Sequence, residues 1–128
     1  MLEVAAVPVL TDNYVWLIHN DETGETAAVD PSVADPVLDA LASRGWSLTQ
    51  VLNTHWHPDH TGGNEALKSA TGCTITAPAE ARRVSQVGRI VAEGDRVAVA
   101  GAEAVVWDIP GHTAGHIAYY FEDEGMIF

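Results

Sequence analysis

The sequence predicts an α+β fold in which helices pack on the outside of β-sheets, and three features indicate it. Residues 14–29 form two apolar segments around turn residues at 20–24, which is typical of a β-hairpin. Alternating strand and helix patterns follow as far as residue 77, and strand patterns prevail from residue 89 onward. A length of 128 residues suits one compact domain, so we expect residues 1–128 to form a single domain.

Each expected element has a local signal. Val37, Leu38 and Leu41 have helical spacing within residues 33–44, and Gly45 can end that helix. Gly72 plays the same part for a second helix that begins near residue 62 and runs to about residue 70. A short helix is expected at 78–85. The expected strands are 2–9, 14–19, 26–29, 50–53, 73–77, 96–99, 104–109 and 117–121, with another beginning at 126.

Composition restricts the classes of function. The chain has 6 Lys+Arg against 18 Asp+Glu, a formal charge of −12, which argues against binding to nucleic acid. A hydrophobic content of 47% supports a buried core, yet no segment approaches the roughly 20 apolar residues of a membrane span. Cys73 is the single cysteine and suits a buried position. No disulfide can form within the chain, and we expect a cytoplasmic protein without a signal peptide.

Histidines gather in two short segments. Of the six in the chain, His55, His57 and His60 fall in the first segment, and His112 and His116 in the second. Neutral imidazole and carboxylate groups are the usual ligands of zinc, and clusters of them call for a functional explanation. The sixth histidine, His19, lies at the end of a predicted strand beside polar residues, where we expect it to be exposed.

The spacing of the first segment favours two metal ions. In extended backbone, residues i and i+2 point the same way, so His55 and His57 can bind one ion together. Asp59 and His60 point away from that pair and can serve a second ion nearby. His112 lies in a loop after a predicted strand and would complete a three-histidine site for the first ion.

Two further residues have open roles. His116 could be a hydrogen-bonding residue behind the metal ligands, or it could be purely structural. Asp30 follows the third predicted strand and could cap the next segment, or it could orient a ligand histidine, as metal-bound histidines usually require.

These motifs resemble a known family. Residues 54–64, THWHPDHTGGN, resemble the signature of the metallo-β-lactamase superfamily. Residues 7–14, 28–31 and 110–117 resemble glyoxalase II, the hydroxyacylglutathione hydrolase branch, so the resemblance covers nearly the whole chain in order. It implies an αββα sandwich with a dinuclear site, usually of zinc, with iron or manganese as substitutes.

The resemblance also implies roles for individual residues and a reaction. His55, His57 and His112 would hold the first metal, and Asp59 and His60 would hold part of the second, with Asp59 contributing to catalysis. The family hydrolyses the thioester S-D-lactoylglutathione to D-lactate and glutathione, by a metal-bound hydroxide. The partner is thus a small thioester, with neither nucleic acid nor membrane involved.

The sequence departs from the family at its end. In the family, the strand that begins at residue 126 leads to an Asp that bridges the two metals, and a later His and the glutathione-binding residues follow. We therefore expect this chain to be an N-terminal portion of the sandwich, and we expect self-association through the missing half.

Other functions remain open. The same fold supports persulfide dioxygenases, which use one iron, and lactonases, which use a dinuclear core. A catalytically silent metal-binding domain is the alternative from another class, because the second half of the site is absent.

Overall fold

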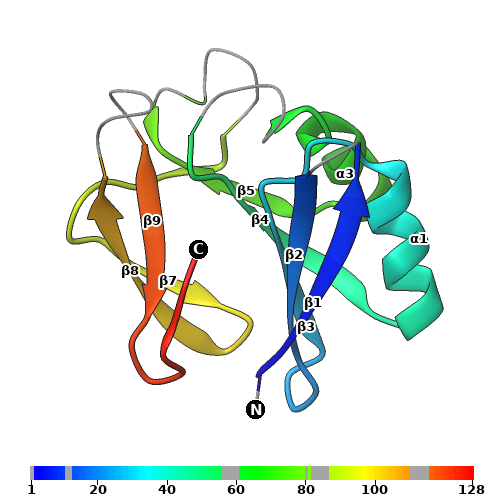
Figure 1. The fold of residues 1–128 in the computed structure, drawn as a ribbon, viewed down its shortest axis with the longest axis horizontal. Helices are drawn as coiled ribbons and strands as arrows, with labels where there is room; N and C mark the ends of the chain where they lie inside the picture. Colours follow the sequence, from blue (N-terminus) through cyan, green and yellow to red (C-terminus); the bar gives the residue numbers. More distant parts are fainter. Residues whose placement is uncertain (1, 11–12, 56–60, 80, 82–86, 110–115) are drawn as a thin grey trace.

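The computed structural model describes residues 2–10, 13–55, 61–79, 81, 87–109 and 116–128, which form two β-sheets and two α-helices (Figure 1). The first sheet has six strands in the order β1-β2-β3-β4-β5-β6, and the second has four in the order β10-β9-β8-β7. The elements are β1 (Leu2–Val9), β2 (Asn13–Asn20), β3 (Glu25–Val29), α1 (Asp35–Arg44), β4 (Ser47–Leu52), α3 (Asn64–Thr71), β5 (Thr74–Ala77), β6 (Arg89–Ile90), β7 (Arg96–Val99), β8 (Ala102–Asp108), β9 (Ile117–Phe121) and β10 (Met126–Ile127).

The six-stranded sheet is mixed. β1, β2 and β3 pair antiparallel, and the predicted hairpin turns at Gly24, whose φ of 75° suits glycine. β3, β4, β5 and β6 pair parallel. Parallel neighbours need long connections, and the helices α1 and α3 supply two of them. The carboxyl ends of β3, β4 and β5 therefore meet at one edge of the sheet, which is where ligands bind in parallel sheets.

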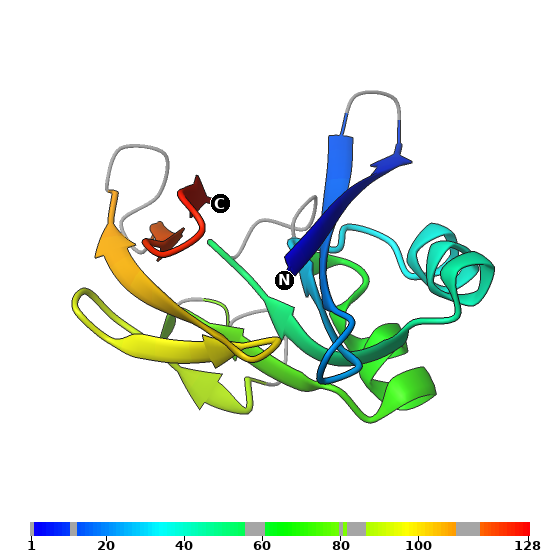
Figure 2. The ribbon, with the colours of Figure 1, turned by 90° about the horizontal axis from the view of Figure 1, so that it is seen from below.

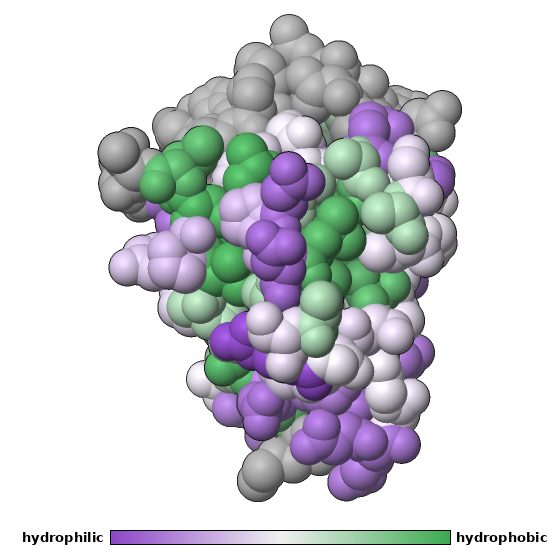
Figure 3. Space-filling model, turned by 90° about the vertical axis from the view of Figure 1, so that its right-hand side faces the viewer, coloured by the Kyte–Doolittle hydropathy of each residue, from purple (hydrophilic) through white to green (hydrophobic). Residues whose placement is uncertain are grey.

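Both helices pack on the six-stranded sheet. α1 buries Val37 and Leu41, as their spacing predicted, and it ends at Gly45 with a φ of 69°. α3 ends at Gly72 with a φ of 72°, which confirms the second predicted stop. On the helix-bearing side, hydrophilic residues break up the apolar surface (Figure 3). Among the residues that the structure describes, no helix is long and apolar enough to cross a membrane.

Two hydrophobic cores lie on opposite faces of the six-stranded sheet. One core joins the sheet to the helices and includes Cys73, which is buried as predicted. The other joins Ile18, Val29 and Leu52 of the first sheet to the second sheet, where Tyr119 and Phe121 are its largest members. Figure 2 shows the second sheet beside the first, with the C-terminus on β10 facing the hairpin of β1 and β2. The α+β class is confirmed, with the order helices, sheet, sheet.

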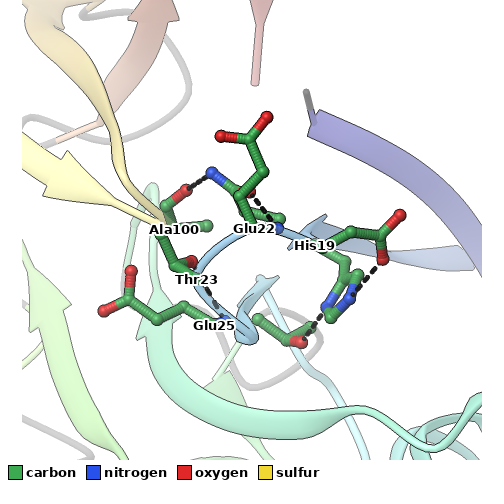
Figure 4. A network of polar contacts seen from close by, with 8 residues as sticks. His19, Glu22, Thr23, Glu25 and Ala100 are labelled. Atoms are coloured by element: carbon green, nitrogen blue, oxygen red, sulfur yellow. Dashed lines mark hydrogen bonds and ion pairs between the residues drawn. The ribbon is translucent and has the colours of Figure 1, made fainter.

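His19 is buried, so the expectation that it is exposed was wrong. Only 5% of the residue is accessible, and its ring stacks on Trp46 at a centroid distance of 4.2 Å. Its Nδ1 lies 2.8 Å from the Thr26 hydroxyl, and its Nε2 lies 2.9 Å from an Asp21 carboxylate oxygen (Figure 4). Trp46 follows α1 and is distant from His19 in sequence, so the residues next to His19 could not indicate that the Trp46 ring buries it.

Asn20, at the end of β2, connects the two sheets. The Asn20 side-chain amide donates to the Ala100 carbonyl oxygen at 2.8 Å, and the Asn20 Oδ1 accepts from the Glu22 backbone N–H (Figure 4). A Cβ on Gly101 would lie 2.9 Å from the Asn20 amide nitrogen, so a glycine leaves room for this contact. The contact lies at the end of β2, away from the carboxyl ends of β3 and β4.

Candidate metal centre

Asp30, Thr54 and His55 lie together at the carboxyl edge of the six-stranded sheet. Asp30 directly follows β3, and its backbone N–H donates to the Leu52 carbonyl at the end of β4. Its φ of 52° lies in the left-handed region, which Asp tolerates better than most residues. His55 lies three residues beyond β4 and is 2% exposed. Parallel pairing of β3 and β4 thus places a carboxylate and a buried imidazole side by side.

Thr54 links the carboxylate to the imidazole. Its backbone N–H donates to Asp30 Oδ1 at 2.8 Å, and its hydroxyl donates to Asp30 Oδ2 at 2.7 Å. The same hydroxyl oxygen lies 2.9 Å from His55 Nδ1. Asp30 is thus connected to His55 through Thr54, which is the kind of contact that orientation of a histidine would require.

The second sheet contributes His116, which the structure brings to His55. The two rings lie 4.4 Å apart between centroids, with planes inclined by 32°. The Ile117 N–H donates to the Thr54 carbonyl at 2.8 Å, so the start of β9 is bound to the histidine segment. His116 is half-buried, and its backbone oxygen accepts from the Ile109 N–H at 3.0 Å. His116 therefore lies next to a predicted metal ligand.

Sequence reasoning missed a buried polar support below the histidine segment. The side chains of Asn53 and Asn64 are both fully buried and exchange amide hydrogen bonds of 2.6 and 3.4 Å. The Tyr119 hydroxyl donates to the Asn53 carbonyl at 2.7 Å and lies 3.3 Å from the Thr76 carbonyl. An Asn at the end of an apolar strand was the available signal, because buried amides require partners.

Gly63 fits tightly against the segment that follows Asp30. Its N–H donates to the Pro31 carbonyl at 2.8 Å. A Cβ at this position would lie 2.8 Å from the Val33 carbonyl carbon and 2.9 Å from the Pro31 oxygen. The φ of −90° at Gly63 is open to any residue, so close backbone packing is what requires glycine here.

Comparison with known proteins identifies the family. The family model of the metallo-beta-lactamase superfamily matches residues 10–128. The chain belongs to the metallo-beta-lactamase superfamily. The metallo-beta-lactamase fold predicted from residues 54–64 is thereby confirmed, and the solved structures agree. The crystal structure of BLEG-1, a B3 metallo-beta-lactamase, has a TM-score of 0.88 at 18% identity, covering 98% of this chain and 70% of its own. The structure of ETHE1 from Myxococcus xanthus has a TM-score of 0.80 at 28% identity, covering 96% of this chain and 54% of its own.

Curated relatives within the superfamily are about 50% identical to this chain in the matched region. A hydroxyacylglutathione hydrolase of Methylococcus capsulatus is 51% identical over all of the chain and 50% of its own length. A hydroxyacylglutathione hydrolase of Rhodospirillum rubrum is 52% identical over 99% of the chain and 50% of its own length. The chain thus spans about half the length of the curated relatives that it matches.

The described part of the site fits the metal that a metallo-beta-lactamase fold implies. Among the described residues, no group of three His, Cys, Asp or Glu side chains could hold an ion. His57, Asp59, His60 and His112, which the sequence predicts as ligands, lie outside the described residues. His55 is described, and its chemistry fits that of a metal ligand. A histidine that binds metal through one ring nitrogen usually contacts a protein group through the other, as Nδ1 of His55 does with Thr54.

The buried Tyr119 hydroxyl is expected to make the fold less stable at alkaline pH. Burial raises the pKa of its hydroxyl well above the ordinary value, and the Asp30 carboxylate raises it further, while Arg89 lowers it. An unfolded chain would ionise this group near pH 10, so its stabilising effect is complete below about pH 10 and is lost as the pH rises toward the folded pKa.

We expect Tyr119→Phe to lower the free energy of unfolding by about 1 kcal/mol at neutral pH, because one buried hydrogen bond is lost. Its stability should then fall less steeply than that of the wild type between about pH 10 and 11. Urea unfolding at both ends of this range measures the difference, and Tyr120→Phe, on the same strand, is the control. Equal pH slopes in Tyr119→Phe and the wild type would contradict the assignment.

An apolar cleft opens beside the site. It has a volume of about 600 Å³ and is lined by residues of the β1–β2 hairpin and of the strands β9 and β10. Asp30, Thr54 and His116 contribute polar atoms to its wall. The apolar residues that line it are Val4, Tyr14, Trp16, Val29, Ile109, Ile117, Met126, Ile127 and Phe128.

Proposed function

We propose that this chain is the metal-binding part of a hydrolase of the hydroxyacylglutathione hydrolase type, which cleaves S-D-lactoylglutathione to D-lactate and glutathione. The observation that carries the proposal is the oriented, buried His55 at the carboxyl edge of the sheet. Two hydrolases of this name share 51% and 52% of their residues with the chain in the matched region. Residues 1–128 are proposed to act as one metallo-β-lactamase-like domain.

The proposed ligands come from three segments. His55, His57 and His112 are proposed to hold a first ion, and Asp59 and His60 part of a second. Zinc is the proposed metal, and iron or manganese could replace it, because imidazole and carboxylate ligands suit all three. When bound, a pair of such ions supplies an activated water and polarises the thioester carbonyl.

The residues of this chain would orient the site. His55 presents a ring nitrogen from a position that Thr54 and Asp30 define through hydrogen bonds of 2.9 and 2.7 Å. The Asn53–Asn64 pair and Tyr119 hold the end of β4 from below, which limits the movement of the histidine segment. Asp59 is proposed as a catalytic residue because it would touch the reacting water.

Metal content and thioester cleavage test the proposal together. The chain, purified after growth with zinc and iron, is analysed for metal and then assayed for loss of the S-D-lactoylglutathione thioester. Bound metal with cleavage supports the proposal. Bound iron with oxygen consumption on a persulfide, or cleavage of a lactone ring, would assign one of the other enzymes of the fold.

A second candidate is a catalytically silent metal-binding domain. The curated relatives are about twice as long as the region that this chain matches, and the remaining metal ligands that the family resemblance implies are not among residues 1–128. Bound metal without turnover of thioester, persulfide or lactone supports this candidate. An absence of bound metal would contradict both candidates.

Location and partners follow from composition in this proposal. The single cysteine, Cys73, is buried, and a chain without disulfides suits the cytoplasm. A charge of −12 disfavours nucleic acid as a partner, and neither the composition nor the proposed chemistry calls for a membrane.

We also propose that the apolar cleft binds a second copy of the chain. Trp16 and Ile127, which both line the cleft, are 40% and 56% exposed, which leaves apolar surface for association. Sedimentation velocity at rising concentration should show an increasing mass, and Ile127→Lys should shift the midpoint at least about tenfold upward. Ile90→Lys is the control, because Ile90 is 44% exposed but lies outside the cleft. A monomer at every concentration would contradict this proposal.

A further inference from the structure

The polarity of the hydrogen bonds around Thr54 decides which ring nitrogen of His55 carries a proton. A threonine hydroxyl has one proton to donate, and here it points to Asp30 Oδ2 at 2.7 Å. Toward His55 Nδ1, 2.9 Å away, the same oxygen can therefore only accept. Acceptance requires a proton on Nδ1, so in the neutral ring the lone pair lies on Nε2.

The carboxylate of Asp30 sets this polarity. An ionised carboxylate is an acceptor only, and both of its oxygens accept from Thr54, one from the backbone N–H and one from the hydroxyl. The whole chain of contacts is thus directed from His55 through Thr54 to Asp30. The Thr54 hydroxyl thus connects the Asp30 carboxylate to the His55 ring.

We infer that Thr54 and Asp30 are positioning residues that hold His55 as the Nδ1–H tautomer and so prepare Nε2 to bind a metal ion. This inference rests on the proposed function for the role of His55 as a ligand. It goes beyond that function because it assigns to the Thr54 hydroxyl a role that a side chain of the same shape without a hydroxyl could not fill.

Asp30→Asn should reverse the direction of the contacts. The Thr54 backbone N–H can only donate, so the new amide must keep its oxygen at the Oδ1 position. The amide NH2 then faces the Thr54 hydroxyl from the Oδ2 position and donates to it. The hydroxyl proton turns to His55 Nδ1, which moves the ring proton to Nε2, where it opposes coordination.

Thr54→Val should remove the contact without reversing it, and Thr54→Ser should preserve it. Because outer contacts of this kind change metal affinity by about 10–100-fold, we expect the largest loss in Asp30→Asn, about tenfold in Thr54→Val and less than about threefold in Thr54→Ser. A variant that only disturbed packing would not produce this order. Asn has nearly the same shape as Asp, and Val has nearly the same shape as Thr, so neither substitution changes the packing much.

Two measurements on the chain of residues 1–128 test the inference. Long-range ¹H–¹⁵N NMR of the metal-free protein labelled in histidine reports the tautomer of His55 without any metal, and competition with a chromogenic chelator reports zinc affinity. We expect the Nδ1–H form in the wild type and in Thr54→Ser, and the Nε2–H form in Asp30→Asn. An Nε2–H wild type, or the same tautomer in wild type and Asp30→Asn, would overturn the inference.

The outcomes separate this inference from the proposed function. If His55→Ala leaves zinc affinity unchanged, the ligand assignment fails, whatever the tautomer. If His55→Ala abolishes zinc binding while Asp30→Asn and Thr54→Val retain full affinity, the ligand assignment stands and the positioning role of Thr54 and Asp30 is overturned.

Discussion

His55→Ala is expected to remove nearly all bound metal from this chain. Loss of a contact behind a ligand already lowers metal affinity about 10–100-fold, so loss of the ligand itself should cost about a hundredfold or more. Elemental analysis of the variant after exhaustive dialysis against zinc buffer measures the result. His57→Ala should give the same loss, because the i and i+2 spacing predicts that both residues bind one ion.

His19→Gln is the matched control for this experiment. His19 is also a buried histidine of the six-stranded sheet, with contacts to Thr26, Asp21 and Trp46, but it lies at the end of β2. A general effect of replacing a buried histidine would lower metal content in both variants. Full metal content in His55→Ala, or equal loss in His19→Gln, would contradict the metal centre proposed at the end of β4.

Gly63→Ala is expected to destabilise the fold by about 3 kcal/mol, although it adds a single methyl group. That methyl group would approach backbone atoms of Pro31 and Val33 to 2.8–2.9 Å, and backbone atoms cannot rotate away. Either the start of α3 or the segment after Asp30 must move, and the 2.8 Å hydrogen bond from Gly63 to Pro31 is strained or lost. Urea unfolding of the metal-free chain measures the loss.

Gly72→Ala provides the comparison for Gly63→Ala. Gly72 has a φ of 72° and open space around its Cα, so alanine there meets only backbone strain, worth about 1 kcal/mol. Zinc affinity should fall in Gly63→Ala, since Asp30 precedes the displaced segment, and it should be unchanged in Gly72→Ala. Equal losses of stability in the two variants would contradict the close packing at Gly63.

Local signals predicted most elements of the fold. The spacing of Val37 and Leu41 and the stop at Gly45 predicted α1 to within two residues of its start. β4 was predicted only in its second half, at 50–53, and the structure extends it from Ser47 to Leu52. Ser47 and Thr49 are exposed residues of that strand, so their polarity concealed it. Most of the helix predicted at 78–85 lies outside the described residues.

The site was predictable where the motif lies in one segment and obscure where distant segments meet. Asp30, His55 and His116 were identified as candidates, and the structure places all three at one edge. The contributions of Thr54 and Tyr119 depend on which strands are neighbours. Strand order is set by packing between residues far apart in sequence, so neither residue could be assigned a role from its own neighbourhood.

The bonds from β9 to the end of β4 have a consequence for how the chain acquires its site. Tyr119 and Asn53 are 66 residues apart, and their hydrogen bond forms only after the second sheet has docked on the first. Contacts of such long range close slowly during folding, because the entropy of the intervening loop is lost before they form. We therefore expect the end of β4 to be fixed late in folding, and a newly made chain to reach the arrangement proposed for metal binding only when both sheets have come together.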